Sequence, residues 1–214
     1  MNIKFLKFKL FIYIVLCKII SIKAQSFTEI AFNENKAIVD TSEIFEKIES
    51  SKSTFDRLLL GTPNDSLLNY YCVFSETKMA YLVLEKDPQS ALNYIANTRS
   101  KFIYIDTTFK FDKELELLLL LQNIITLKAE KNNFITQQIL EKKCEQFYLQ
   151  NKNNPRASLI YAYCQNTFNK PKQALTLINI TIEKFKLEKH NAQKIAWGIA
   201  FAKNIKKKIL KTKT

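Results

Sequence analysis

The chain has 214 residues, 47% of them apolar and 25% charged, which is the composition of a globular protein. Its two glycines, single histidine and four cysteines, none in a C-x-x-C pair, are too few for phosphate-binding loops, most all-β folds, zinc sites or Cys/His catalytic sites. The net charge of +13 is concentrated at the ends, with five lysines in residues 1–24, six in 203–214 and only +2 between them, which excludes a nucleic-acid-binding stripe.

Residues 1–24 have the order of a secretory signal peptide. Three lysines precede an apolar run from Leu10 to Cys17, and Ala24 supplies a small residue at a cleavage point, with Ser26 as the alternative. An uncleaved anchor is less well supported, because a spanning helix needs about 20 apolar residues and a lysine interrupts this shorter run. We therefore expect a mature chain that is exported to the periplasm, the cell envelope or the outside.

Residues 25–39 follow as an N-terminal arm whose structure the sequence does not decide. The stretch fits a short strand, an extended arm or an early helical turn. Asp40 followed by Glu43 resembles a capping box and predicts that the first helix covers residues 40–60, with Gly61 at its C-terminal stop.

Seven further helices are expected, separated by connections of a few residues. All four prolines stand where a helix can begin, since the first turn tolerates a missing N–H group. The predicted ranges are 65–86, 88–104, 108–131, 133–150, 155–168, 171–187 and 190–210. A leucine-rich run from Leu115 to Leu121 makes one of them apolar on most sides, so we expect that helix to be the central core element. Short connections make neighbouring helices antiparallel, and no strand is predicted among them.

The predicted helices also contain a weak internal sequence repeat. Residues 87–92 (DPQSAL) open one helix and residues 170–175 (KPKQAL) open another, with residues 133–138 (NFITQQ) in a corresponding place between them. A spacing of about 40 residues in a helical chain predicts stacked hairpins, each of which hides its apolar face against the next.

Residues 157–185 resemble one helix-turn-helix unit of the tetratricopeptide repeat, with Ala162 and Ala174 as small packing residues. A weaker match runs from Leu67 to Ile95. The resemblance implies an all-α fold over residues 40–210, in which antiparallel helical hairpins stack as a short tetratricopeptide-like solenoid. It also implies a protein or peptide partner bound along a concave groove.

Tyrosines are the candidates for anchoring such a partner, because their rings are apolar and carry one polar tip. Tyr70, Tyr71, Tyr81 and Tyr161 are our candidate partner-binding residues. The alternative is that they fill the space between hairpins, as aromatic residues at helical spacing commonly do.

The last predicted helix carries an apolar stripe that should close the C-terminal end of the array. Its members are Trp197, Phe201, Ile205 and Ile209. The basic tail, residues 203–214, overlaps this helix. Its candidates for contact with anionic lipid, polysaccharide or an acidic protein are Lys206, Lys207, Lys208 and Lys211. The alternative is a solvated tail that serves solubility alone.

Three cysteines remain after removal of the leader: Cys72, Cys144 and Cys164. A turn midway between the two helices that carry Cys144 and Cys164 pairs Cys144 with about residue 160, so Cys164 falls one helical turn out of register. We therefore expect buried thiols, with a disulfide as the alternative. His190 has no neighbouring ligand and is expected at the surface without a metal.

Acidic pairs such as Asp112 with Glu116 have ordinary surface spacing for a helix, and no set of residues suggests a catalytic site or a cofactor. We therefore expect an exported, non-enzymatic helical-repeat protein that mediates protein–protein or protein–peptide interaction in the cell envelope. The alternative is a structural or surface-associated protein that its basic tail holds to an anionic surface. Neither function involves nucleic acid.

Overall fold

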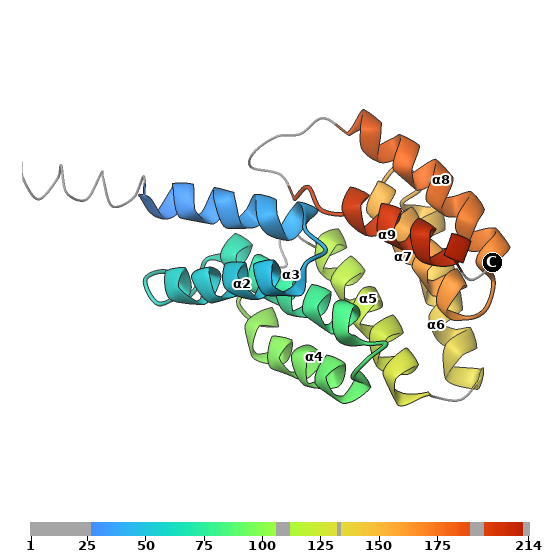
Figure 1. Cartoon of the computed structure of the whole chain (residues 1–214), viewed down its shortest axis with the longest axis horizontal. Coiled ribbons are helices and arrows are strands. Elements are labelled where there is room, and N and C mark those ends of the chain that lie inside the picture. The colour runs from blue at the N-terminus through green and yellow to red at the C-terminus, as the bar shows by residue number, and fades with distance from the viewer. Residues whose placement is uncertain (1–26, 106–111, 132–133, 189–194, 212–214) are drawn as a thin grey trace, which may run out of the picture.

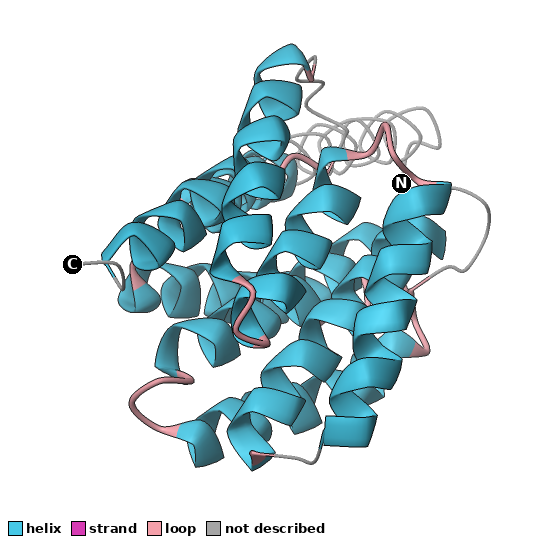
Figure 2. Cartoon of the chain, turned by 90° about the vertical axis from the view of Figure 1, so that its right-hand side faces the viewer, coloured by secondary structure: helices cyan, strands magenta, loops and turns pink. Residues whose placement is uncertain are grey.

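The computed structural model describes residues 27–105, 112–131, 134–188 and 195–211. These parts of the chain are helices joined by turns and short irregular stretches, with no strand among them (Figure 2). No helix within them is long and apolar enough to cross a membrane. The expected signal peptide, His190 and the last three residues of the basic tail lie outside the described residues.

The fold is all-α, as predicted, and consists of antiparallel helical hairpins that stack against one another (Figure 1). A first helix covers residues 27–41 of the described chain and is called the N-terminal helix below. The helices that follow are α2 (Phe45–Leu59), α3 (Ser66–Val83), α4 (Pro88–Phe102), α5 (Asp112–Glu130), α6 (Phe134–Gln150), α7 (Pro155–Thr167), α8 (Pro171–Leu187) and α9 (Ile199–Lys211).

Local capping signals explain the starts of α3, α4, α7 and α8. Pro88, Pro155 and Pro171 each occupy the first turn of a helix, where no intrahelical N–H bond is lost. Asp65 caps α3 by accepting a hydrogen bond from the Leu68 N–H at 2.9 Å. These starts were readable because the residues that set them are sequence neighbours.

The predicted helix start at Asp40 is wrong. Asp40 lies inside the N-terminal helix, and α2 begins only at Phe45 without a side-chain cap. The Asp40 carboxylate is buried, where it accepts a hydrogen bond from Tyr71 Oη at 3.2 Å and lies 3.5 Å from Lys36 Nζ. The Asp40 carboxylate therefore binds side chains within the fold and does not cap the start of a helix, so the local capping pattern does not decide the helix boundary.

The predicted last helix is also too long at its start. Residues 195–198 are not helical, and α9 begins at Ile199. Trp197 therefore precedes the helix and is fully buried, whereas Phe201, Ile205 and Ile209 do form the expected buried stripe. We refer to residues 195–211 as the C-terminal segment.

Helix α5 packs on both α3 and α7, while α4, α6 and α8 alternate with these three helices along the chain. The leucine-rich helix α5 is a core element, as predicted, since Leu117, Leu118 and Leu121 are buried. The most deeply buried helix is α3, in which every residue from Leu68 to Tyr81 is buried. The centre of the fold thus includes a helix that carries many polar and aromatic side chains.

Candidate interaction site

Three of the four candidate partner-binding tyrosines are buried and are not available to a partner. Tyr70 and Tyr71 are fully buried, and Tyr81 is only 2% exposed, because α3 is covered on all sides. Tyr161 on α7 is half-buried, and its ring stacks on that of Tyr148 at 5.4 Å. Three of the four tyrosines are therefore core residues, as the alternative interpretation held.

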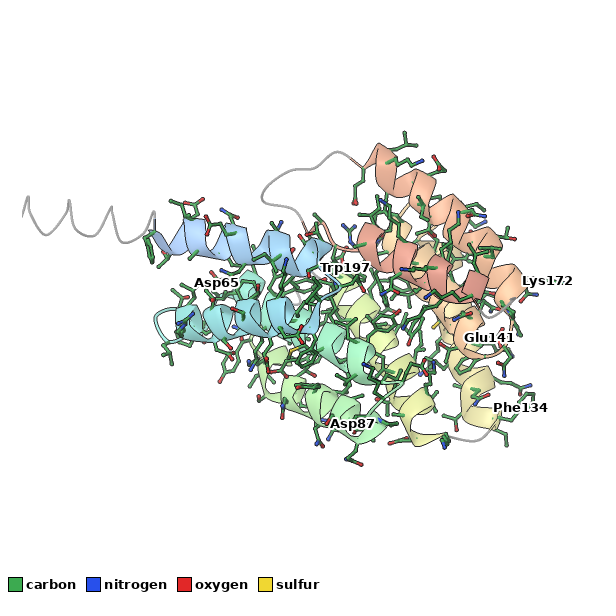
Figure 3. All side chains as sticks on the ribbon, viewed as in Figure 1. Asp65, Asp87, Phe134, Glu141, Lys172 and Trp197 are labelled. Atoms are coloured by element: carbon green, nitrogen blue, oxygen red, sulfur yellow. The ribbon has the colours of Figure 1, made fainter. Side chains whose placement is uncertain are left out.

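These tyrosines of α3 hold the C-terminal segment of the same chain. Trp197 Nε1 donates a hydrogen bond to Tyr70 Oη at 2.6 Å, and the Trp197 ring lies 4.7 Å from the Phe74 ring. The Phe201 ring meets the Tyr81 ring edge to face at 4.4 Å. Figure 3 places Trp197 in the middle of the molecule, where the N-terminal and C-terminal helices meet. The chain thus uses its aromatic anchors internally.

Arg156 of α7 fixes the beginning of the C-terminal segment. Its side chain is 3% exposed, and it donates hydrogen bonds to the Ile195 carbonyl at 2.5 Å and to both carboxylate oxygens of Glu188 at 2.9 and 3.2 Å. The guanidinium also lies 5.8 Å from the centre of the Trp197 ring. Burial lowers the pKa of Arg156, but the nearby carboxylates of Glu114 and Glu188 more than offset this and raise it overall.

Gly198 makes the turn from this anchored stretch into α9. Its φ is +130°, a conformation that side chains strongly disfavour. A Cβ at this position would lie 2.2 Å from Cζ of Phe185, which is closer than two carbon atoms can approach. The rarity of glycine in this chain was the one signal in the sequence that marked this position.

The helix α9 has one apolar face and one basic face. Phe201, Ile205 and Ile209 are buried against the rest of the protein. The opposite face is open to solvent and borders a shallow hollow of about 410 Å³. It is lined by Lys203, Lys206, Lys207, Leu210 and Lys211, which we call the lysine face. The predicted basic tail is therefore, over its described residues, a rigid helix docked on the fold.

Lys208, one of the four candidate contact lysines, does not belong to this face. Its Nζ lies 4.4 Å from the centre of the Tyr81 ring, and burial lowers its pKa. Lys203, in contrast, joins the lysine face although it was not among the candidates. Helical spacing was the missed signal, because residues four apart share a face and Lys203 precedes Lys207 by four.

Three of the four lysines of this face, those nearest the beginning of α9, are not neutralised by described acids. Among the residues that the structure describes, no ion pair involves Lys203, Lys206 or Lys207. These three lysines therefore place positive charge on a fixed helical backbone, available for an anionic partner.

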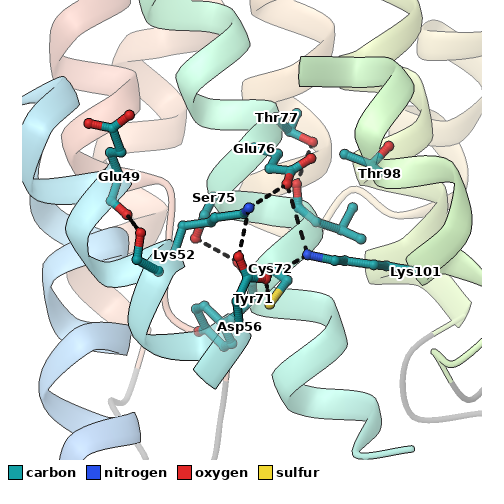
Figure 4. Close-up of polar contacts among 12 residues, drawn as sticks. Glu49, Lys52, Asp56, Tyr71, Cys72, Ser75, Glu76, Thr77, Thr98 and Lys101 are labelled. Carbon is teal, nitrogen blue, oxygen red and sulfur yellow. Dashed lines mark hydrogen bonds and ion pairs between the residues drawn. The ribbon is translucent and has the colours of Figure 1, made fainter. Parts of the chain in front are cut away.

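A second charged cluster lies between α2, α3 and α4 (Figure 4). Lys52 Nζ is 2.7 Å from Asp56 Oδ2 and 3.1 Å from Glu76 Oε1, and Lys101 Nζ is 2.7 Å from Asp56 Oδ1. Burial raises the pKa of Asp56, but hydrogen bonds from Lys101 and Lys52 offset this and lower it overall. Two cations balance two anions here, so this cluster holds α2 and α4 on α3 and has no excess charge for a ligand.

No other chemistry stands out in the described part of the chain. Among its residues, no three histidine, cysteine, aspartate or glutamate side chains converge to hold a metal ion. Comparison with known proteins finds no family model that matches the chain, and no curated protein or solved structure with significant similarity to it. The lysine face thus remains the best-defined candidate site.

Proposed function

We propose that this chain is an exported, non-enzymatic helical-repeat protein that binds a protein or peptide partner in the cell envelope. The lysine face of α9 is its contact surface, and the partner presents acidic side chains to it. The observation that carries this proposal is that the apolar face of α9 is buried against the fold while the lysine face lies on the opposite side of the helix. The tetratricopeptide-like stacking of hairpins supplies the rigid support.

Rigid display matters for the strength of such a contact. Lysines on a flexible tail lose conformational freedom when they bind, which offsets part of the electrostatic attraction. The backbone of α9 is already ordered, so Lys203, Lys206 and Lys207 keep a fixed spacing along the helix. Charge complementarity of this kind raises the association rate and weakens as salt screens it.

The same face supports a second candidate function, attachment to an anionic surface. Leu210 lies among the lysines and is 46% exposed, so an apolar side chain accompanies the charge, as in helices that lie on membranes. Each lysine near an anionic membrane contributes about 1 kcal/mol of attraction. This candidate predicts binding to lipid vesicles, whereas the first predicts binding to acidic peptides.

The test compares two triple variants of equal charge. One carries Lys203→Gln, Lys206→Gln and Lys207→Gln on the lysine face. The control carries substitutions of the same type at three exposed lysines of other helices, Lys47, Lys142 and Lys143. Point substitutions are required because a deletion from residue 203 would also remove Ile205 and Ile209 from the core.

Binding is measured by fluorescence anisotropy of a labelled polyglutamate peptide, and by co-sedimentation with phosphatidylserine or phosphatidylcholine vesicles, at low and physiological salt. We expect the lysine-face variant to bind at least tenfold more weakly than the control. Binding to the peptide alone supports the first function, and binding to anionic vesicles alone supports the second. Equal losses in both variants, or no salt-sensitive binding by the natural chain, would contradict the lysine face as the contact surface.

A further inference from the structure

The antiparallel helices α6 and α7 are in a register that two side-chain pairs define. Tyr148 of α6 stacks on Tyr161 of α7, with their ring centres 5.4 Å apart and an angle of 21° between the rings. At the other end, Gln165 Nε2 of α7 donates a hydrogen bond to Glu141 Oε1 of α6 at 2.8 Å. Figure 3 shows Glu141 where these two helices run side by side.

Cys144 and Cys164 lie between these two pairs at the same level of the hairpin. Cys144 is one turn from both Glu141 and Tyr148 along α6, and Cys164 is one turn from Tyr161 along α7. The expectation that Cys164 is a full turn out of register with Cys144 is therefore wrong. It assumed a turn centred midway between the predicted helices, whereas the pairs Tyr148–Tyr161 and Glu141–Gln165 place the centre of the hairpin slightly later in the chain.

The two thiols lie close together inside the protein, because the register of the hairpin places them at one level. Both cysteines are buried and are free thiols in this structure. A hydrogen bond to Cys144, together with burial, raises the pKa of Cys164 well above its usual value. The geometry of a disulfide requires facing Cβ atoms and Cα atoms within about 7 Å, a condition that facing residues of adjacent packed helices can meet.

We propose that Cys144 and Cys164 form a disulfide bond that joins α6 to α7 in the exported protein. The oxidant is a disulfide compound, either a small one such as oxidised glutathione or a thiol–disulfide oxidoreductase. One cysteine thiolate attacks the oxidant and releases one thiol, and the second thiolate displaces the other from the mixed disulfide. The two cysteines lose two protons and two electrons, and the oxidant is reduced to two thiols.

Burial places this reaction during folding, before the hairpin closes over the sulfur atoms. The bond would act on a helix that has few buried residues. The helix α6 buries only one stripe, namely Leu140, Cys144 and Phe147, while Phe134 and Ile135 near its beginning are exposed. A covalent link through the middle of that stripe fixes α6 to the better-buried α7.

Cys72 is an internal control. It is as deeply buried as the other two cysteines, but its nearest described polar partner is Asp56 Oδ1, 3.7 Å from its sulfur. Burial raises the pKa of the Cys72 thiol to about 12. The proposal therefore predicts that Cys72 stays reduced under the conditions that oxidise the pair.

The experiment refolds the full chain in a mixture of oxidised and reduced glutathione, then unfolds it and alkylates every remaining thiol with iodoacetamide. Mass spectrometry should find alkyl groups on Cys17 and Cys72 only, and a linked pair of peptides that carry Cys144 and Cys164 and separate on reduction. The oxidised chain should also melt at a higher temperature than the reduced chain. This inference does not depend on the lysine face, and its failure would leave the proposed function untouched.

Two variants separate the bridge from general effects on folding. Cys72→Ser should keep the linked peptides, and Cys144→Ser should leave Cys164 alkylated and remove the difference in melting temperature between oxidising and reducing conditions. The measurement on the natural chain decides the matter even where a variant folds poorly. Full alkylation of Cys144 and Cys164 in a refolded helical chain, or a bridge that includes Cys72, would overturn the proposal.

Discussion

The N-terminal helix and α9 lie at opposite ends of the described chain and are held in different ways. The N-terminal helix buries polar groups, since Lys36 and Asp40 are both nearly inaccessible and Lys78 Nζ of α3 donates a hydrogen bond to the Val39 carbonyl at 2.8 Å. The buried face of α9 is apolar and consists of Phe201, Ala202, Ile205 and Ile209.

The two helices show how polar and apolar contacts position a helix differently. Buried polar groups destabilise the fold unless they are paired, so the N-terminal helix has few alternative positions. The same pairing makes its docking depend on the protonation state of those groups. Apolar contacts are strong and insensitive to pH, but they tolerate sliding along the helix axis. The position of α9 is accordingly set before the helix begins, by Arg156 and Gly198.

Replacing Arg156 with methionine should break the anchoring of the C-terminal segment most severely. The substitution keeps much of the apolar bulk but leaves Glu188 and the Ile195 carbonyl without their donor. Loss of one partner from a buried pair typically costs roughly 3–5 kcal/mol. Urea unfolding measures the effect, with Arg57→Met on the exposed side of α2 as the control, for which we expect a change below about 0.5 kcal/mol. Similar losses in the two variants would show that the anchor is not needed.

The substitution Gly198→Ala should have the next largest effect. It adds a Cβ that meets the Phe185 ring and forces a residue other than glycine into a positive φ. Strain and overpacking together suggest a loss of roughly 2–4 kcal/mol. Gly61→Ala is the matched control, because a Cβ there meets only the Leu58 carbonyl oxygen at an ordinary 3.6 Å. If thermal unfolding finds the two variants equally stable, Gly198 does not set the position of α9.

Asp40 should give the N-terminal helix a pH dependence that α9 lacks. Burial raises the pKa of Asp40 to about 6 from an ordinary value of 3.8, although Lys36 and Tyr71 act to lower it. Since the folded state then takes up the proton first, this group adds stability as pH falls from about 6 to 4 and removes it again as pH rises. The shift corresponds to at most about 3 kcal/mol, at 1.4 kcal/mol per pKa unit.

The measurement is the free energy of unfolding of the natural chain and of Asp40→Asn between pH 4 and pH 7. The natural chain should lose stability relative to the variant as pH rises through this window. Asp87→Asn is the control, because hydrogen bonds from Ser90 lower the pKa of that exposed carboxylate and give it the opposite trend. A constant difference between the natural chain and Asp40→Asn would contradict the assignment.

The smallest expected changes in stability come from lysines on different faces of α9. Changing Lys203, Lys206 and Lys207 to glutamine should alter stability by less than about 0.5 kcal/mol, because Lys203 and Lys207 are exposed, Lys206 is only half-buried, and none of the three forms an ion pair with a described residue. Lys208→Gln should cost about 1 kcal/mol, since it removes a partly buried cation from the face of the Tyr81 ring. Thermal unfolding of the two proteins checks the order, and a larger loss in the triple variant would reverse our assignment of the faces.

The sequence was informative wherever the deciding residues are close together along the chain. Asp65, Asp87 and the prolines of the first turns place the starts of α3, α4, α7 and α8 correctly, and the leucine run of α5 indicates its burial. The all-α class and the antiparallel hairpins follow from these local signals together with the short connections.

What the sequence did not predict depends on contacts between distant residues. The helical state of residues 27–41 and the buried position of Asp40 depend on α3, and the register of Cys144 against Cys164 depends on how the α6–α7 connection folds. The exclusion of Lys208 from the lysine face depends on its contact with Tyr81 of α3. The tyrosines of α3 are of a residue type common at protein interfaces, but the structure shows that they contact Trp197 and Phe201 of the same chain.

The position of Trp197 has a consequence for the order in which the molecule is made. Trp197 donates a hydrogen bond to Tyr70, which lies 127 residues earlier in the sequence. Asn204 of α9 donates a hydrogen bond to Glu43, which lies 161 residues earlier. A ribosome delivers α3 long before it delivers these partners, so the aromatic side of that helix stays open to water until synthesis is nearly complete. Contacts of such long range also form slowly. A premature stop codon a few residues before Trp197 would therefore damage the middle of the molecule, although it removes only the end of the chain.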